Sequence, residues 1–259
     1  MTQLQRLAIA PNQLNNQHIF LTAEQQHYLG RVLRLREGDR FIAMDGQGQW
    51  WLAQLEASQS QAQVLEPILI QTELPVSITL VVALPKGNGF DDVVRQATEL
   101  GVSCIAPIIS DRTLLKPSSQ KLERWQRIAQ EAAEQSERQL IPPVSAPVAF
   151  ESYLQTPNQQ QQMPDLQQYL CVARGTAPHL LNCLRHSFKQ VLHPLETVQI
   201  RVAIGPEGGW TEQEVEQAIA VGYQPVSLGQ RILRSVTAPL VALAIIAAAL
   251  ESTQMSLYD

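Results

Sequence analysis

The spacing of apolar and polar positions changes near residue 74, and the change divides the chain into two domains. Before it, short stretches of alternating apolar residues are separated by glycine-containing turns, which is typical of a small β-rich domain. Strands are predicted at 40–44, 49–55 and 62–65, after a helix at 23–35. Because the Leu74-Pro75 pair interrupts the pattern, we predict domains over residues 1–73 and 76–259.

Beyond this boundary the apolar runs are longer and rich in β-branched residues, and they alternate with amphipathic stretches of helical period. Such runs are typical of strands that are buried on both faces. The predicted strands cover 78–84, 102–109, 169–173, 198–204 and 226–228, and the predicted helices include 91–100, 121–140 and 237–250. We therefore expect an α/β fold in which helices cover both faces of a mostly parallel sheet.

The predicted helix at 23–35 carries a basic face. A capping box formed by Thr22 and Gln25 signals its start, and Arg31 and Arg34 share one side of the helix. The net charge of the whole chain is −5, so no general basic field attracts nucleic acid. A nucleic-acid partner must therefore be bound by local arginines such as these.

The composition is that of a globular protein, with 45% apolar and 17% charged residues. Three cysteines without C-x-x-C spacing favour reduced thiols in a cytoplasmic protein. The amino terminus lacks a signal-peptide pattern, and the longest apolar run, 238–250, is shorter than the roughly 20 residues that span a bilayer. No membrane association is expected. No metal site is expected either, because the histidines have no cysteine or carboxylate at ligand spacing.

The stretch from 202 to 211 joins an apolar strand, a glycine-rich turn and a capped helix start. Gly205 and Gly208 let backbone N–H groups approach a ligand closely, and Pro206 stiffens the turn. The spacing matches neither G-x-G-x-x-G nor G-x-x-x-x-G-K-[ST], which argues against a dinucleotide fold and a P-loop. The pattern predicts a ligand-binding loop and leaves the ligand open.

A second strand passes into a glycine-containing loop nearer the carboxyl terminus. In that loop Leu228, Ile232 and Leu233 offer an apolar slot, while Arg231 and Arg234 are suited to an anion. Ligands in open α/β sheets bind at the carboxyl ends of strands, so the two loops are expected to form two walls of one pocket. A structural turn with surface arginines is the alternative interpretation.

Three further candidates are weaker when taken alone. Lys86 lies beside Gly87 and Gly89 after a strand, which permits a phosphate site, but without P-loop spacing an ordinary turn is the better interpretation. A small-molecule or nucleotide-binding enzyme that uses this loop remains an alternative. Arg112 and Arg138 stand alone, and single arginines usually lie on the surface without a specific role. No G-x-S-x-G motif supports a hydrolase.

Several short blocks occur in a consistent order along nearly the whole chain. They are RVLRLREGD at 31–39, Lys86, ELGV at 99–102, EAAEQSER at 131–138, the glycine-rich loop at 205–209 and the segment 228–234. Together they resemble the ribosomal RNA small subunit methyltransferase E family, the bacterial uridine-N3 methyltransferases of the SPOUT superfamily. Several blocks at consistent separation are far more specific than any single one, so the chain is identified as a member of this family.

The resemblance implies an N-terminal PUA-like RNA-binding β-barrel, a C-terminal SPOUT domain with a trefoil knot, and a homodimer. It also implies S-adenosylmethionine as methyl donor and N3 of a uridine in 16S ribosomal RNA, within the assembled 30S subunit, as the target. One departure lies at 234–238, where the family commonly has Arg-Thr-Glu-Thr-Ala and this chain has Val236 in place of the glutamate. A non-catalytic RNA-binding or ribosome-assembly protein with this fold is the alternative that Val236 motivates.

The expected site residues fall into three groups. The catalytic candidates are Arg234 and Arg138, for stabilising the uracil anion, and Glu207, for accepting the N3 proton or holding a cofactor group. The cofactor-binding candidates are Gly205, Pro206, Glu207, Gly208, Leu228, Gly229, Ile232, Leu233 and Thr237. The RNA-binding candidates are Arg31, Arg34, Lys86, Arg112 and Arg231.

Overall fold

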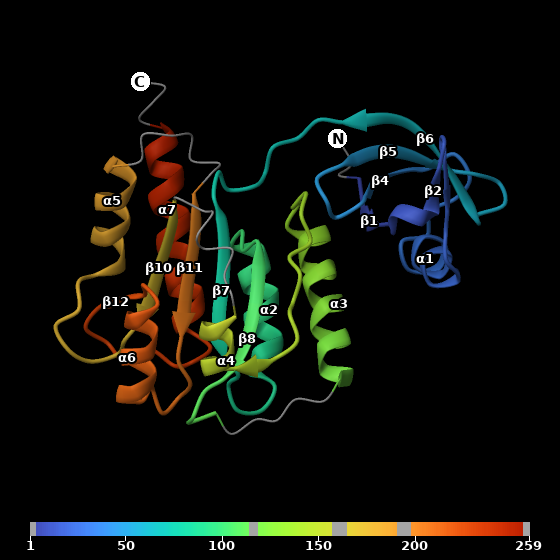
Figure 1. Cartoon of the computed structure of the whole chain (residues 1–259). Coiled ribbons are helices and arrows are strands. Elements are labelled where there is room, and N and C mark those ends of the chain that lie inside the picture. The colour runs from blue at the N-terminus through green and yellow to red at the C-terminus, as the bar shows by residue number, and fades with distance from the viewer. Residues whose placement is uncertain (1–3, 114–118, 157–164, 191–197, 256–259) are drawn as a thin grey trace. The chain divides into compact units, whose positions relative to one another are not determined.

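The computed structural model describes residues 4–113, 119–156, 165–190 and 198–255, which belong to two compact units (Figure 1). One unit contains Met1–Glu73 together with Gln130–Ile141, and the other contains Leu74–Ala129 and Pro142–Asp259. The sequence pattern carries no signal that Gln130–Ile141 joins the first unit, because its first residues continue a helix that starts in the second.

The first unit is built on a six-stranded sheet in the order β1-β4-β5-β6-β3-β2. The strands are β1 (Arg6–Ala8), β2 (Leu14–Asn15), β3 (His18–Phe20), β4 (Arg40–Met44), β5 (Trp50–Leu55) and β6 (Gln61–Ile68). Strands β1 and β4 are parallel, and the other neighbours are antiparallel. Every second residue of these strands is buried in the core: Phe41 and Ala43 on β4, and Ala53 and Leu55 on β5. This alternation is the pattern from which the two strands are predicted. Strands β1 to β3 are too short to show it.

The predicted helix at 23–35 is confirmed only at its start, where the capping box begins α1 (Ala23–His27). The chain then widens into a π-helix (Tyr28–Val32), and Arg34 has a positive φ of 59°. A π turn changes the angle between successive side chains, so the prediction that Arg31 and Arg34 share one helical face is wrong. Both residues are nevertheless exposed.

The second unit contains a parallel sheet in the order β12-β10-β11-β7-β8-β9, and the predicted α/β class is confirmed. The strands are β7 (Ser77–Ala83), β8 (Cys104–Ile109), β9 (Val148–Ala149), β10 (Leu166–Cys171), β11 (Gln199–Ile204) and β12 (Gln224–Val226). The chain leaves the adjacent strands β7 and β11 in opposite directions, toward β8 and β12 respectively. Open α/β sheets bind ligands beside such a reversal.

Helices cover both faces of this sheet, as predicted (Figure 1). They are α2 (Gly89–Glu99), α3 (Ser119–Gln135), α4 (Phe150–Gln155), α5 (Leu180–Gln190), α6 (Glu212–Ala220) and α7 (Ala238–Met255). Leu80 and Val202 pack with buried side chains of α2, α5 and α7, whereas Val81 and Ala203 pack with α4 and α6. None of the helices within the described residues is long and apolar enough to span a membrane.

The segment after α3 is fixed by a buried ion pair within the first unit. Helix α3 ends at Gln135, earlier than the predicted helix at 121–140, and Glu137 adopts a positive φ of 61°. The guanidinium of Arg138 then donates to the carboxylate of Glu73. The other oxygen of that carboxylate accepts the backbone N–H of Gln139 at 2.8 Å. The Arg138 side chain is only 4% exposed, so the pair is largely shielded from water.

We predict that Arg138→Ala lowers the free energy of unfolding by about 3 kcal/mol, because it leaves the Glu73 carboxylate desolvated without its cation. Denaturant unfolding followed by circular dichroism measures the change. Arg95→Ala is the control, since its ion pair with Asp92 is exposed and is worth less than about 1 kcal/mol. Equal losses of unfolding free energy in both variants would show that the Arg138–Glu73 pair stabilises the protein no more than an exposed ion pair does.

Candidate functional site

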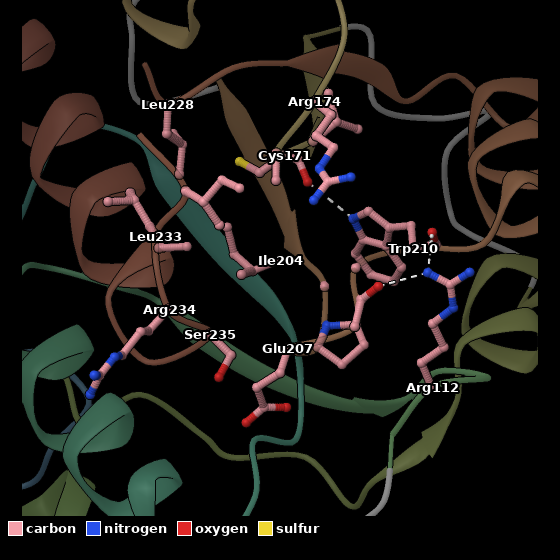
Figure 2. Close-up of a pocket in the computed structure, with 18 of the residues that line it drawn as sticks. Arg112, Cys171, Arg174, Ile204, Glu207, Trp210, Leu228, Leu233, Arg234 and Ser235 are labelled. Atoms are coloured by element: carbon pink, nitrogen blue, oxygen red, sulfur yellow. Dashed lines mark hydrogen bonds between the residues drawn. The ribbon is translucent and has the colours of Figure 1, made fainter. Parts of the chain in front are cut away.

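A pocket of about 1170 Å³ lies at the carboxyl edge of the parallel sheet (Figure 2). Its walls are the turns that follow β10, β11 and β12, together with the start of α6. The predicted residues that line it are Arg112, Gly205, Pro206, Glu207, Gly208, Leu228, Gly229, Arg231, Ile232, Leu233 and Arg234. The two loops singled out from the sequence therefore do meet in one pocket.

The glycine-rich turn packs tightly against Trp210. A Cβ at Gly205 would lie 3.0 Å from the Trp210 ring, so only glycine leaves the ring in place. The Trp210 ring in turn stacks on Phe150 at a centroid separation of 4.6 Å. Its Nε1 donates to the backbone carbonyl of Cys171 at 3.0 Å, which ties the turn after β11 to the end of β10. Two walls of the pocket are thus joined through one indole.

The start of α6 is capped as the sequence predicts. Thr211 Oγ1 accepts the backbone N–H of Glu214, and the Glu214 carboxylate accepts the backbone N–H of Thr211 at 2.8 Å. The same buried carboxylate accepts the backbone N–H of Asp111 at 3.0 Å. The cap therefore also holds the turn that follows β8 against the glycine-rich turn.

Arg112 is predicted to bind RNA, but in the structure its guanidinium contacts the glycine-rich turn. Its Nη1 donates to the carbonyl oxygen of Gly208 at 2.6 Å, and the side chain packs where a Cβ on Gly208 would lie. This bond fixes the outer end of the glycine-rich turn. Arg112 lines the pocket, but this contact uses its guanidinium to brace the protein's own backbone.

Three other arginines around the pocket are exposed and make no ion pair within the described part of the chain. They are Arg174, Arg231 and Arg234. Figure 2 shows Arg174 and Arg234 on opposite sides of the cavity. Arg174 is not among the residues predicted from the sequence, although its position directly after the predicted strand at 169–173 is a usable signal. An anionic ligand would meet cations on both sides of this pocket.

The carboxylate of Glu207 connects two neighbouring turns. Its Oε1 accepts the backbone N–H of Lys86 at 2.9 Å, across the point where the connections from β7 and β11 diverge. Partial burial on its own would raise the pKa of the Glu207 carboxyl group. Hydrogen bonding to the backbone N–H groups of Lys86 and Glu207 and to the Ser235 side chain outweighs burial, so the pKa is lowered. Glu207 is therefore ionised at neutral pH and already accepts several hydrogen bonds.

Five predicted site residues lie outside the lining of this pocket: Arg31, Arg34, Lys86, Arg138 and Thr237. Arg31 and Arg34 are exposed in the first unit, whereas Lys86 donates its backbone N–H to Glu207 and its charge also lowers the pKa of that carboxylate. Arg138 is a correction to the catalytic candidates, because its guanidinium is buried against Glu73 within the first unit. Among the described residues, no cluster of three or more His, Cys, Asp or Glu side chains is placed to hold a metal ion.

A lowered pKa in the folded state means that the Glu207 carboxylate stabilises the fold above its ordinary pKa of 4.5. This contribution is lost as the pH falls through the lowered value. We therefore predict that the stability difference between the wild type and Glu207→Gln is constant above about pH 5 and shrinks at lower pH. Thermal unfolding over this range measures it. Glu212→Gln is the control, as this exposed carboxylate on the same rim makes no hydrogen bond or ion pair within the described residues. A difference that grows on acidification would contradict the assignment.

Comparison with known families defines the class of the protein. A model described as an RNA methyltransferase domain matches residues 72–247, and one described as an RNA methyltransferase PUA domain matches residues 21–65. The expected combination of a PUA-like N-terminal unit and a C-terminal parallel α/β unit is confirmed by these matches and by the structural similarity below. The chain is thus built as an RNA methyltransferase with a PUA domain.

Curated relatives narrow this class. A Synechocystis protein named ribosomal RNA small subunit methyltransferase E is 51% identical over 95% of this chain and 78% of the relative. A Bacillus subtilis protein of the same name is 32% identical over 87% and 88% of the two chains. The crystal structure of such an enzyme from Neisseria gonorrhoeae, bound to S-adenosylmethionine, is 30% identical and has a TM-score of 0.81, covering 95% of this chain and 98% of that one. The chain belongs to the ribosomal RNA small subunit methyltransferase E family.

Proposed function

We propose that the protein transfers a methyl group from S-adenosylmethionine to N3 of a uridine in 16S ribosomal RNA. The observation that carries the proposal is the pocket itself. Two glycine-containing turns at the carboxyl edge of the sheet enclose it, in a chain whose relatives bear the name of this enzyme. The Neisseria gonorrhoeae relative with the same fold has S-adenosylmethionine bound.

The lining of the pocket fits this cofactor. Ile204, Leu228 and Leu233 supply apolar surface of the kind that packs against an adenosine, while Gly205 and Gly208 leave backbone groups accessible. The methionine part ends in a carboxylate, for which the exposed arginines supply cations. When bound, the sulfonium of the cofactor supplies the methyl group for an in-line displacement, which requires chiefly that donor and acceptor be positioned.

The acceptor nitrogen must lose its proton before it can attack. We assign to Arg234 the stabilisation of the resulting uracil anion, because its guanidinium is exposed at the pocket and has no carboxylate partner within the described residues. Glu207 is ionised and able to accept a proton, but hydrogen bonds from Lys86 and Ser235 already stabilise its charge and weaken it as a base. We therefore favour a role for Glu207 in binding and loop positioning.

The first unit, predicted from the sequence as a domain over 1–73, is proposed to bind the RNA. Its PUA-domain match and the exposed Arg31, Arg34 and Arg36 on one short stretch support this assignment. Lys86 and Arg231 in the second unit also have exposed side chains, and they are proposed to contact RNA phosphates near the target. The substrate is proposed to be the assembled 30S subunit in the cytoplasm.

A homodimer is also part of the proposal, since the family resemblance implies it. Helix α7 buries Leu243, Ile246 and Leu250 in the core, yet Ala244 and Ala248 on the same apolar helix are exposed. A helix that is apolar all round requires burial on more than one side. Mass measurement in solution distinguishes a dimer from a monomer.

The reaction is tested by incubating the protein with labelled S-adenosylmethionine and either isolated 30S subunits or naked 16S ribosomal RNA. We expect label on the subunits, at N3 of one uridine, and much less on naked RNA. Binding of RNA without any transfer would instead support the non-catalytic assembly role that Val236 motivates.

For the cofactor, we predict that Gly205→Val weakens S-adenosylmethionine binding by at least about tenfold, or about 1.4 kcal/mol, because its side chain displaces the Trp210 ring. Calorimetric titration measures the affinity, and circular dichroism checks that the fold is retained. Gln230→Ala changes an exposed residue on the neighbouring loop that does not line the pocket, so it serves as the control. Unchanged affinity in Gly205→Val would remove this turn from the cofactor site.

For the RNA, we predict that Arg34→Ala reduces the slope of log affinity against log salt by about 1, because one phosphate contact and its released counterion are lost. Filter binding at several salt concentrations measures the slope. Arg95→Ala is the control, since Arg95 is already paired with Asp92. The RNA-binding assignment of Arg34 fails if both variants keep the wild-type slope.

A further inference from the structure

The turn that joins β7 to α2 touches two walls of the cofactor pocket without lining it. Residues 85–89 are absent from the pocket lining, and their sequence suggested either a phosphate site or an ordinary turn. Their contacts in the structure point in another direction, toward the loops that follow β11 and β12.

The first contact is polar. The backbone N–H of Lys86 donates to Glu207 Oε1 at 2.9 Å, and the buried Ser235 lies beside the same carboxylate and lowers its pKa. One side chain thus links the turn after β7, the glycine-rich turn and the loop that leads into α7. Figure 2 shows Ser235 and Glu207 beside each other at one end of the pocket.

The second contact is steric. A Cβ at Gly89 would lie only 2.7 Å from Cγ1 of Val236, which is closer than carbon atoms approach in folded proteins. Gly89 is the first residue of α2 and has no positive φ, so its backbone does not require glycine. Helix propensity alone would favour alanine there. The space is instead filled by a methyl of Val236, whose β-branched side chain cannot easily rotate away.

We propose that Gly89 and Val236 form a packing contact that positions the loop of residues 228–236 as a wall of the cofactor pocket. Val236 lines the pocket on one side and meets the start of α2 on the other, so a shift of α2 or of Val236 moves this wall. Both are positioning residues, and the contact gives Val236 a function in this chain that needs no charge. The inference rests on the proposed use of S-adenosylmethionine.

The test is a double-mutant cycle on S-adenosylmethionine affinity, with Gly89→Ala, Val236→Ala and the double variant in the full chain. Gly89→Ala is expected to weaken binding about tenfold, since the new methyl pushes Val236 and its loop. Adding Val236→Ala removes the obstructing methyl, so the double variant should bind more tightly than Gly89→Ala alone. Recovery when a truncation is added to Gly89→Ala is a result that a general loss of stability does not produce.

Asn88→Ala is the matched control in the same turn, because its exposed side chain makes no capping hydrogen bond, and it should bind like the wild type. With 30S subunits as substrate, KM for S-adenosylmethionine should rise in Gly89→Ala while KM for the subunit is unchanged.

Wild-type affinity in Gly89→Ala, or no recovery in the double variant, overturns the inference. If Gly89→Ala fails to fold, the folded Val236→Ala variant decides: weaker binding supports the contact and unchanged binding overturns it. Failure of the wild type to bind S-adenosylmethionine overturns the proposed function instead.

Discussion

The Glu207 carboxylate is the interaction on which the arrangement of the site depends. It accepts a hydrogen bond from the turn after β7 and lies beside Ser235 of the loop before α7, which lowers its pKa, while its own residue belongs to the turn after β11. A parallel sheet brings the carboxyl ends of its strands to one edge, but it does not determine how the turns there meet. One ionised side chain at the reversal point of the sheet provides that connection.

Neighbouring contacts extend this connection around the pocket. The Trp210 indole ties the glycine-rich turn to β10, Arg112 holds the carbonyl of Gly208, and Val236 packs against Gly89. Each contact uses a group that could have been assigned to a ligand when the sequence was considered alone. The structure therefore divides the conspicuous residues into those that brace the loops and those, such as Arg174, Arg231 and Arg234, whose charges stay available to a ligand.

The sequence predicted the parallel sheet and the meeting of the two loops, because unbroken β-branched runs and glycine after a strand are local signals. It did not predict the π-helix after His27, whose geometry depends on packing and not on residue spacing. Nor did it predict that Arg138 pairs with Glu73, which lies 65 residues earlier in the chain. Arg174 was missed although it directly follows the predicted strand at 169–173, because a single arginine usually lies on the surface without a specific role. Pairing between distant segments has no periodic signature, so only the folded chain shows it.

The central claim is that the turns at the carboxyl edge of the parallel sheet bind S-adenosylmethionine. Hydrogen–deuterium exchange of the intact chain with and without this cofactor tests the claim most directly, since it locates the bound molecule along the backbone. We predict slower exchange in peptides that cover 204–210 and 228–236, and no change in peptides of the first unit. Protection confined to other segments, or no protection at saturating cofactor, would contradict the account.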